Sequence, residues 1–160
     1  MQRIESSWNV LVALVGQIQD AGGLTKVGAD GWTVKDHLAH IAAWEHSLLA
    51  LIEGRDRSLG MGLTEPLEGI DAINEAVRKL HESDTAEEAL GYFRASHLQL
   101  VTALDKLSDG DLQKPYSHYQ PSDPDEERPV IGWVGGNTYE HYAEHIAWIN
   151  QLLSESSAAR

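Results

Sequence analysis

Helical periodicity in four long segments is the feature that most constrains how this chain can fold. Apolar residues recur at intervals of three and four, the spacing of one helix face, over residues 2–21, 34–53, 85–107 and 134–153. No segment shows the strict alternation of a half-buried strand. Segments of about twenty residues form helices about 30 Å long, and such helices bury their apolar faces by packing together. We therefore predict an all-α fold, a four-helix bundle.

Capping residues mark where two of these helices begin. Thr33 and Thr85 are each followed three residues later by a carboxylate, Asp36 and Glu88. This spacing lets the hydroxyl and the carboxylate bond each other's backbone N–H groups, an arrangement known as a capping box. The second long helix is expected to end at Gly54, because glycine readily adopts the left-handed conformation that terminates a helix.

The segments between the long helices hold most of the glycine and proline and one further short helix. Helical spacing predicts this helix over residues 71–81, and loops are expected over residues 54–66 and 116–129. The connection between the second and third long helices is long enough to cross the bundle, so consecutive helices need not be antiparallel. We predict that residues 1–160 form a single four-helix bundle domain with a crossover connection and one additional short helix.

The charge of the chain argues against two classes of partner. Twelve Lys and Arg against twenty-five Asp and Glu give a formal net charge of −13, and protonation of all eight His would still leave it negative. Nucleic-acid binding requires a basic face that neutralises phosphates, and an anionic membrane surface attracts basic segments. We expect neither nucleic acid nor membrane among the partners.

The absence of Cys restricts the chemistry further. Disulfides, thiolate zinc sites and cysteine nucleophiles are excluded, so a transition metal would have to be bound by imidazole and carboxylate. Residues 8–16 are apolar, but they follow Glu5 and lead to no small-residue cleavage site. No run approaches the ~18 apolar residues of a membrane helix, and we expect a cytoplasmic protein.

The clearest sign of chemistry is the sequence His141-Tyr-Ala-Glu-His145. Residues four apart lie one turn apart on the same face of a helix, so two imidazoles at this spacing can converge on one metal ion. A third ligand must come from another helix, and His40 is the best candidate because its neighbours are Leu and Ile expected in the core. Three neutral imidazoles form an open site suited to zinc or nickel, with positions left for water and substrate.

Two other interpretations of this histidine pair stand beside the metal site. Histidines four apart on an apolar helix face are often structural, and they can bridge helices without a metal. The same five residues also fit H-x-x-E-H, a zinc-peptidase pattern in which the glutamate is the general base. That pattern expects a further ligand downstream, and no His follows His145, which argues against a peptidase.

Two glutamates on these helices are candidates for supporting roles. Glu144 lies beside His141 around the helix, where it can act as a general acid or base, orient a ligand, or simply be a solvated carboxylate. Glu45 falls within the apolar arc of the second long helix. A buried carboxylate needs a partner, so Glu45 is expected to hydrogen-bond a ligand imidazole or to tie two helices together.

The remaining histidines have several interpretations. His37 lies on the same side of its helix as His40. Three roles are open to it: metal ligand, hydrogen-bond partner of a ligand, or residue at the rim of the site. His97 lies within the apolar stripe of the third long helix and is expected to be a hydrogen-bonded core residue. His46 and His81 are predicted at the surface. His118, between two tyrosines in the long loop, is expected on a mobile loop or a lid.

Several of these segments resemble a known family. Gly31-Trp-Thr-Val-Lys-Asp-His-Leu-Ala-His-Ile-Ala-Ala-Trp-Glu45 resembles the second-helix signature of the DinB/YfiT-like superfamily of metalloenzymes, and Gly136-Asn-Thr-Tyr-Glu-His-Tyr-Ala-Glu-His145 resembles its last bundle helix. Residues 71–74 and 107–112 are similar to the same group, near its mycothiol-dependent maleylpyruvate isomerase N-terminal branch.

The resemblance implies a fold, a metal and a chemistry. It implies a four-helix bundle, often a homodimer, that holds a divalent metal through three histidines, which here would be His40, His141 and His145. It also implies zinc or nickel at the site and a low-molecular-weight thiol as co-substrate. Its characterised members are thiol-dependent S-transferases and isomerases.

These observations lead to two functional hypotheses. The first is a metal-dependent thiol S-transferase or hydrolase acting on a small electrophilic molecule, with Glu144 as the proton carrier. Because the chain has no Cys, any reacting thiol must arrive as a substrate. The alternative is a non-catalytic bundle that binds and sequesters a small molecule or pairs with a partner helix.

Overall fold

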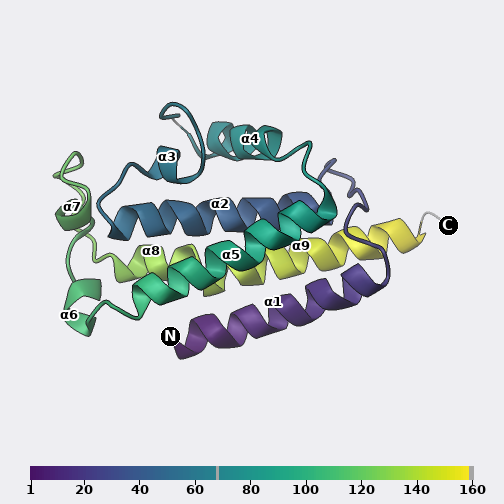
Figure 1. Cartoon of the computed structure of the whole chain (residues 1–160), viewed down its shortest axis with the longest axis horizontal. Coiled ribbons are helices and arrows are strands. Elements are labelled where there is room, and N and C mark those ends of the chain that lie inside the picture. The colour runs from purple at the N-terminus through teal and green to yellow at the C-terminus, as the bar shows by residue number, and fades with distance from the viewer. Residues whose placement is uncertain (68, 159–160) are drawn as a thin grey trace.

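The computed structural model describes residues 1–67 and 69–158, and helices dominate this part of the chain (Figure 1). The long helices are α1 (Gln2–Asp20), α2 (Val34–Ile52), α5 (Ala86–Leu104) and α9 (Tyr139–Ala158). The shorter ones are α3 (Arg57–Gly60), α4 (Ile70–Leu80), α6 (Asp109–Leu112), α7 (Tyr116–Tyr119) and α8 (Ile131–Gly136). The described residues form no β-strand and only two isolated bridges, which confirms the all-α prediction. Within them, no helix combines the length and the hydropathy needed to cross a bilayer.

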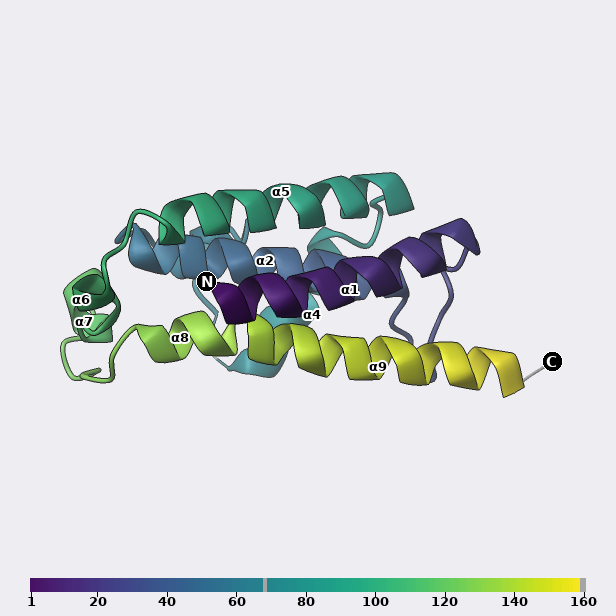
Figure 2. The same ribbon diagram turned by 90° about the horizontal axis from the view of Figure 1, so that it is seen from below.

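The four long helices form a bundle in which α2 and α5 run in the same direction. Helix α2 packs against α5 and α9, and α1 packs against α9. After α2, the chain returns along the outside of the bundle through α3 and α4 before α5 begins (Figures 1 and 2). This return is the predicted crossover connection, and α4 is the predicted short helix.

Helix α2 is the centre of the core. It is buried along almost its whole length, because α5 and α9 pack against it and the crossover covers its outer side. The apolar side chains of all four long helices form one cluster, with Leu11, Leu38, Leu100 and Ile149 among its fully buried members. A helix enclosed in this way can place a side chain toward every neighbouring element.

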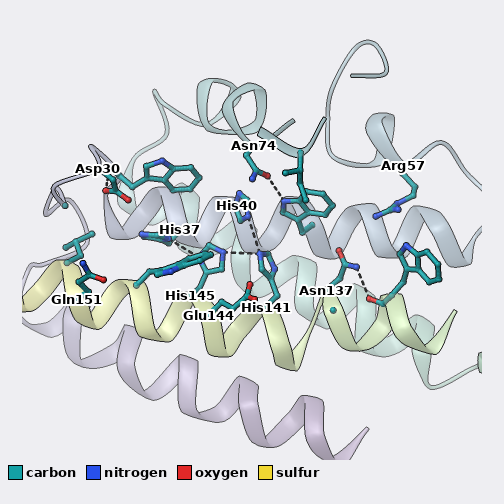
Figure 3. A pocket seen from close by; sticks show the side chains of 18 of the residues that line it. Asp30, His37, His40, Arg57, Asn74, Asn137, His141, Glu144, His145 and Gln151 are labelled. Carbon is teal, nitrogen blue, oxygen red and sulfur yellow. Dashed lines mark hydrogen bonds between the residues drawn. The ribbon is translucent and has the colours of Figure 1, made fainter. Parts of the chain in front are cut away.

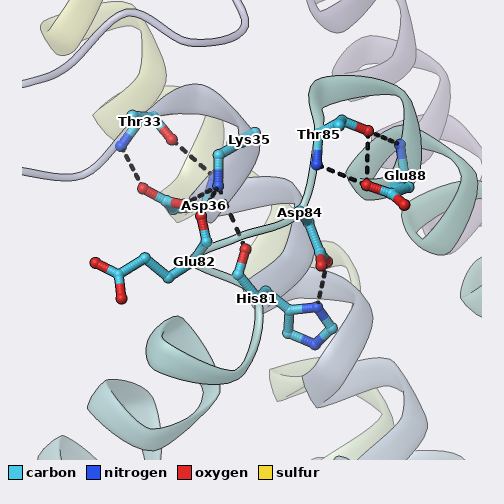
Figure 4. Close-up of polar contacts among 8 residues, drawn as sticks. All are labelled: Thr33, Lys35, Asp36, His81, Glu82, Asp84, Thr85 and Glu88. Carbon is cyan, nitrogen blue, oxygen red and sulfur yellow. Dashed lines mark hydrogen bonds and ion pairs between the residues drawn. The ribbon is translucent and has the colours of Figure 1, made fainter.

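Both predicted capping boxes are present (Figure 4). The Thr33 hydroxyl accepts a hydrogen bond from the Asp36 N–H at 3.2 Å, and the Thr33 N–H donates to the Asp36 carboxylate at 2.9 Å. Lys35 donates to this carboxylate and also to the backbone carbonyls of His81 and Glu82. Burial opposes ionisation of Asp36, but the bonds from Thr33 and Lys35 outweigh it and lower the pKa of Asp36. The start of α2 is thereby fastened to the end of the crossover.

The predicted fourth helix is divided in two. The chain leaves the helix after Gly136, and α9 begins at Tyr139. Side chains provide the physical reason, since the Asn137 amide donates to the carbonyl of Trp133 and the Thr138 hydroxyl donates to that of Val134. The Thr138 N–H bonds the Gly135 carbonyl instead of the Val134 carbonyl, next to two glycines that favour helix poorly. The loops expected over residues 54–66 and 116–129 likewise contain the one-turn helices α3 and α7.

A buried carboxylate connects three of the long helices. Glu45 of α2 is fully buried and accepts hydrogen bonds from Ser96 of α5 and Tyr142 of α9. The Nδ1 atom of His97 lies 3.0 Å from the same carboxylate, and the His97 ring stacks on Trp8 of α1. Of the two predicted roles of Glu45, the tie between helices is confirmed, and His97 is a hydrogen-bonded core residue as predicted.

We expect Glu45→Ala to be among the most destabilising single substitutions in the chain. It leaves Ser96, His97 and Tyr142 without their shared acceptor, and removing one member of a buried polar group costs about 3 kcal/mol or more. Urea unfolding followed by circular dichroism measures this loss. The matched control is Glu53→Ala, because Glu53 is exposed at the end of the same helix and its removal should change stability by less than about 0.5 kcal/mol. Equal midpoints for the two variants would contradict the role assigned to Glu45.

Candidate metal centre

Helices α2 and α9 bring His40, His141 and His145 together (Figure 3). The Nε2 atom of His141 lies 3.2 Å from Nε2 of His40 and 3.0 Å from Nε2 of His145. The spacing of four along α9 sets the second of these contacts, and the packing of α2 against α9 sets the first. The three histidines named from the sequence are therefore one cluster.

The cluster has the donor chemistry and the spacing of a three-histidine metal site. Two nitrogens bound to one zinc ion at 2.0–2.1 Å in tetrahedral geometry lie about 3.3–3.4 Å apart, close to the two contacts of His141. Nitrogens this close need a proton or a cation between their lone pairs. The Nδ1 atoms of His40 and His141 are also buried and have no hydrogen-bond partner among the described residues. Side chains present here could therefore hold one divalent transition metal.

Burial keeps these imidazoles neutral. It lowers the pKa of His40 to about 3, with the neighbouring imidazoles of His141 and His37 adding to the effect. It lowers the pKa of His141 to about 4. Burial, and then the three nearby imidazoles, hold the pKa of His145 well below its ordinary value. At neutral pH all three rings carry lone pairs, which is the state that metal binding requires.

His37 lies on α2, as His40 does, and contacts His145 of the cluster. Its Nδ1 atom lies 2.9 Å from Nδ1 of His145, so one ring can donate a hydrogen bond to the other. Such a contact fixes the tautomer and the orientation of an imidazole whose other nitrogen faces the cluster. Of the roles open to His37, the structure shows this hydrogen-bond contact with His145.

The cluster opens into a large pocket between α2 and α4 on one side and α8 and α9 on the other. The pocket has a volume of about 1170 Å³. Four of the five tryptophans of the chain line it, namely Trp32, Trp44, Trp133 and Trp148. The Trp44 indole donates to Asn74 of α4 at 3.1 Å, which attaches the crossover to this wall. A pocket of this size and lining can enclose a small organic molecule.

Glu144 lies on the pocket wall beside His141 (Figure 3). Its side chain is exposed and has no hydrogen bond or ion pair to any described residue. It is not a member of the three-histidine group. Its position is open to a molecule in the pocket, and its catalytic role stays a prediction.

The other histidines lie away from the pocket. His118 is exposed on α7 and does not line the pocket, whereas the neighbouring Tyr116 packs on Trp133, which does. His46 and His81 were predicted at the surface, but both are partly buried and stack on Tyr92. They are covered because the crossover folds back over α2.

Sequence reasoning missed the walls of the pocket. Arg57 of α3, Arg128 and Trp133 line one end of it, and Asp30 and Glu155 line the other. The signal that was available is the number of tryptophans, five in a chain with a single Phe. Because of its size Trp is rarely fully buried, and none of the five tryptophans is fully buried in the structure.

Fold and site together define a helical bundle with a buried histidine cluster open to a pocket. The chain belongs to the DinB superfamily, whose family model matches residues 3–153. Comparison with curated proteins and with solved structures gave no significant match to either.

Proposed function

We propose that this protein is a metalloenzyme in which His40, His141 and His145 hold one divalent transition metal, zinc or nickel. The observation that carries the proposal is the convergence of three neutral Nε2 atoms at the wall of a large pocket. Membership of the DinB superfamily supports it. A three-histidine site leaves positions open for a small molecule, as a catalytic metal requires.

The reaction we propose is the transfer of a small thiol, or of water, to a small electrophile. A metal bound here would lower the pKa of a coordinated thiol or water so that the anion is available near neutral pH. The sequence resemblance to the mycothiol-dependent maleylpyruvate isomerase branch supports a thiol. Because the chain has no Cys, this thiol is a second substrate rather than a side chain.

Three features of the pocket would serve this reaction. The Glu144 carboxylate, free of protein partners among the described residues, would hold the proton that leaves the thiol or water. His37 would keep the His145 ring oriented through their hydrogen bond. Trp44 and Trp148 would stack against the substrate body on either side of the cluster.

We expect the wild-type protein to bind about one zinc ion per chain, and His141→Ala to lose it. The substitution removes the imidazole that contacts both other rings, and two imidazoles alone make a weak site. Metal analysis after dialysis gives the stoichiometry, and bound zinc should raise the melting temperature of the wild type but not that of His141→Ala. His118→Ala, which removes an exposed histidine outside the pocket, should behave as wild type. A wild-type protein that retains less than a tenth of an equivalent of zinc and of nickel would overturn the proposal.

We expect Glu144→Gln to reduce turnover about 100-fold while zinc binding is unchanged, since general acid–base groups contribute about 10²–10⁴-fold. The assay follows loss of the thiol in mixtures of zinc-loaded protein, a small thiol and an electrophile such as 1-chloro-2,4-dinitrobenzene. Glu140→Gln is the matched control, because Glu140 is exposed on the same helix but does not line the pocket. Equal rates for the two variants would show that Glu144 is only a solvated carboxylate.

The alternative is a bundle that sequesters a small molecule without converting it. The volume of the pocket and its tryptophan lining favour this second candidate. The two proposals differ in one outcome. Sequestration predicts that a ligand binds and is recovered unchanged from zinc-loaded protein, whereas the enzyme releases a product.

A further inference from the structure

An arginine at one end of the pocket has no acidic partner among the described residues. Arg57 lines the pocket and is partly buried, in a chain that has twice as many acidic as basic residues. Among the described residues its side chain forms no ion pair, and the hydrogen bonds of that side chain go only to Ser47 and Tyr116. A guanidinium carries five N–H donors, so several of them remain available on the pocket side.

The surrounding contacts hold Arg57 in place. Its Nε atom donates to the buried hydroxyl of Ser47 on α2 at 3.0 Å. Helix α3 lies directly against α2 at Gly60, where a Cβ atom would stand only 2.6 Å from the Cβ of Ala50. A charged group fixed in this way loses little conformational freedom when a ligand binds.

The charges of the pocket are separated along its length. Figure 3 places Arg57 and Asn137 on one side of the three histidines and Asp30 on the other. Arg128 also lies at the Arg57 end, but its guanidinium is already paired with Glu126. One positive charge without an acidic partner therefore stands at this end, whereas the carboxylate of Glu144 lies beside the histidines and Asp30 and Glu155 line the far end. This field orients an anionic molecule with its negative group toward Arg57.

We propose that Arg57 is the recognition site for a carboxylate on the small molecule that reacts at the histidine cluster. A single guanidinium matches a carboxylate with one negative charge, through two parallel N–H···O bonds. The aromatic faces of Trp133 and Tyr116, which pack together beside it, favour an apolar or aromatic body next to that carboxylate. This inference rests on the proposed function in one respect, namely that the molecule reacts at the histidine cluster. The contact between its carboxylate and Arg57 does not depend on that function.

The test compares two probes of the same shape, 4-phenylbutyrate and the neutral 4-phenylbutan-1-ol. Isothermal titration calorimetry gives their dissociation constants in the zinc-loaded protein and again after chelation. In wild type we expect the carboxylate to bind about tenfold more tightly than the alcohol, the effect of one charge-assisted bidentate contact. Arg57→Gln should reduce this ratio to about one, and Arg57→Lys should keep part of it because the charge remains. Because binding of the alcohol is measured in every variant, a general loss of folding is recognised separately.

Arg55→Gln is the matched control. Arg55 lies two residues away, is exposed, and pairs with Glu53 outside the pocket, so the ratio should stay at its wild-type value. A wild-type ratio near one would overturn the proposal, as would a ratio that survives Arg57→Gln. A preference that chelation abolishes but Arg57→Gln leaves intact would place the carboxylate on the metal and would also overturn it. If 3-phenylpropyl phosphate binds more tightly than 4-phenylbutyrate, Arg57 recognises a phosphate ester and the carboxylate proposal is overturned.

The failure of this inference and the failure of the proposed function are distinguishable. Failure of zinc binding refutes the proposed function, but the ratio of the two dissociation constants can still be measured in chelated protein and tests Arg57 by itself.

Discussion

The buried carboxylate of Glu45 is the constraint on which the site depends. It accepts a hydrogen bond from Tyr142, the residue next to His141, while His40 lies five residues before Glu45 on α2. A polar bond in an apolar core tolerates no slippage, since a shift along either helix would leave the carboxylate without its donors. The same bond therefore sets the register between α2 and α9. With this register the rings of His40 and His141 meet on the opposite side of the interface.

Helices α2 and α9 each have one face in the core and another that lines the pocket. On α9, Tyr142 points into the core and His141 and His145 line the pocket. On α2, Glu45 is enclosed by α5 and α9, whereas His37, His40 and Trp44 border the pocket. Polar groups on the core side are satisfied by one another. On the pocket side, the Nε2 atoms of His40 and His145 both contact Nε2 of His141, and no other protein group satisfies them among the described residues.

The sequence predicted what depends on local geometry. The four long helices, both capping boxes and the convergence of His141 with His145 follow from periodicity and spacing over a few residues. The position of His40 could be predicted because its helix was identified as buried. The break before α9 follows two glycines that the sequence shows, but its place depends on the hydrogen bonds of Asn137 and Thr138. Arg57 and the cover over His46 were missed because they depend on how the crossover folds back over α2, which no local pattern encodes. The single domain, the homodimer and the cytoplasmic location stay predictions.

The crossover has a consequence for how this protein can change. The histidine cluster rests on two helices of the core, but much of the surrounding wall comes from α3, α4 and residues 128–137, which lie outside the four long helices. Substitutions in those outer segments alter the shape and charge of the pocket without disturbing the packing of the bundle. The shape and charge of the pocket can therefore change through these outer segments while the histidine cluster and the core stay the same.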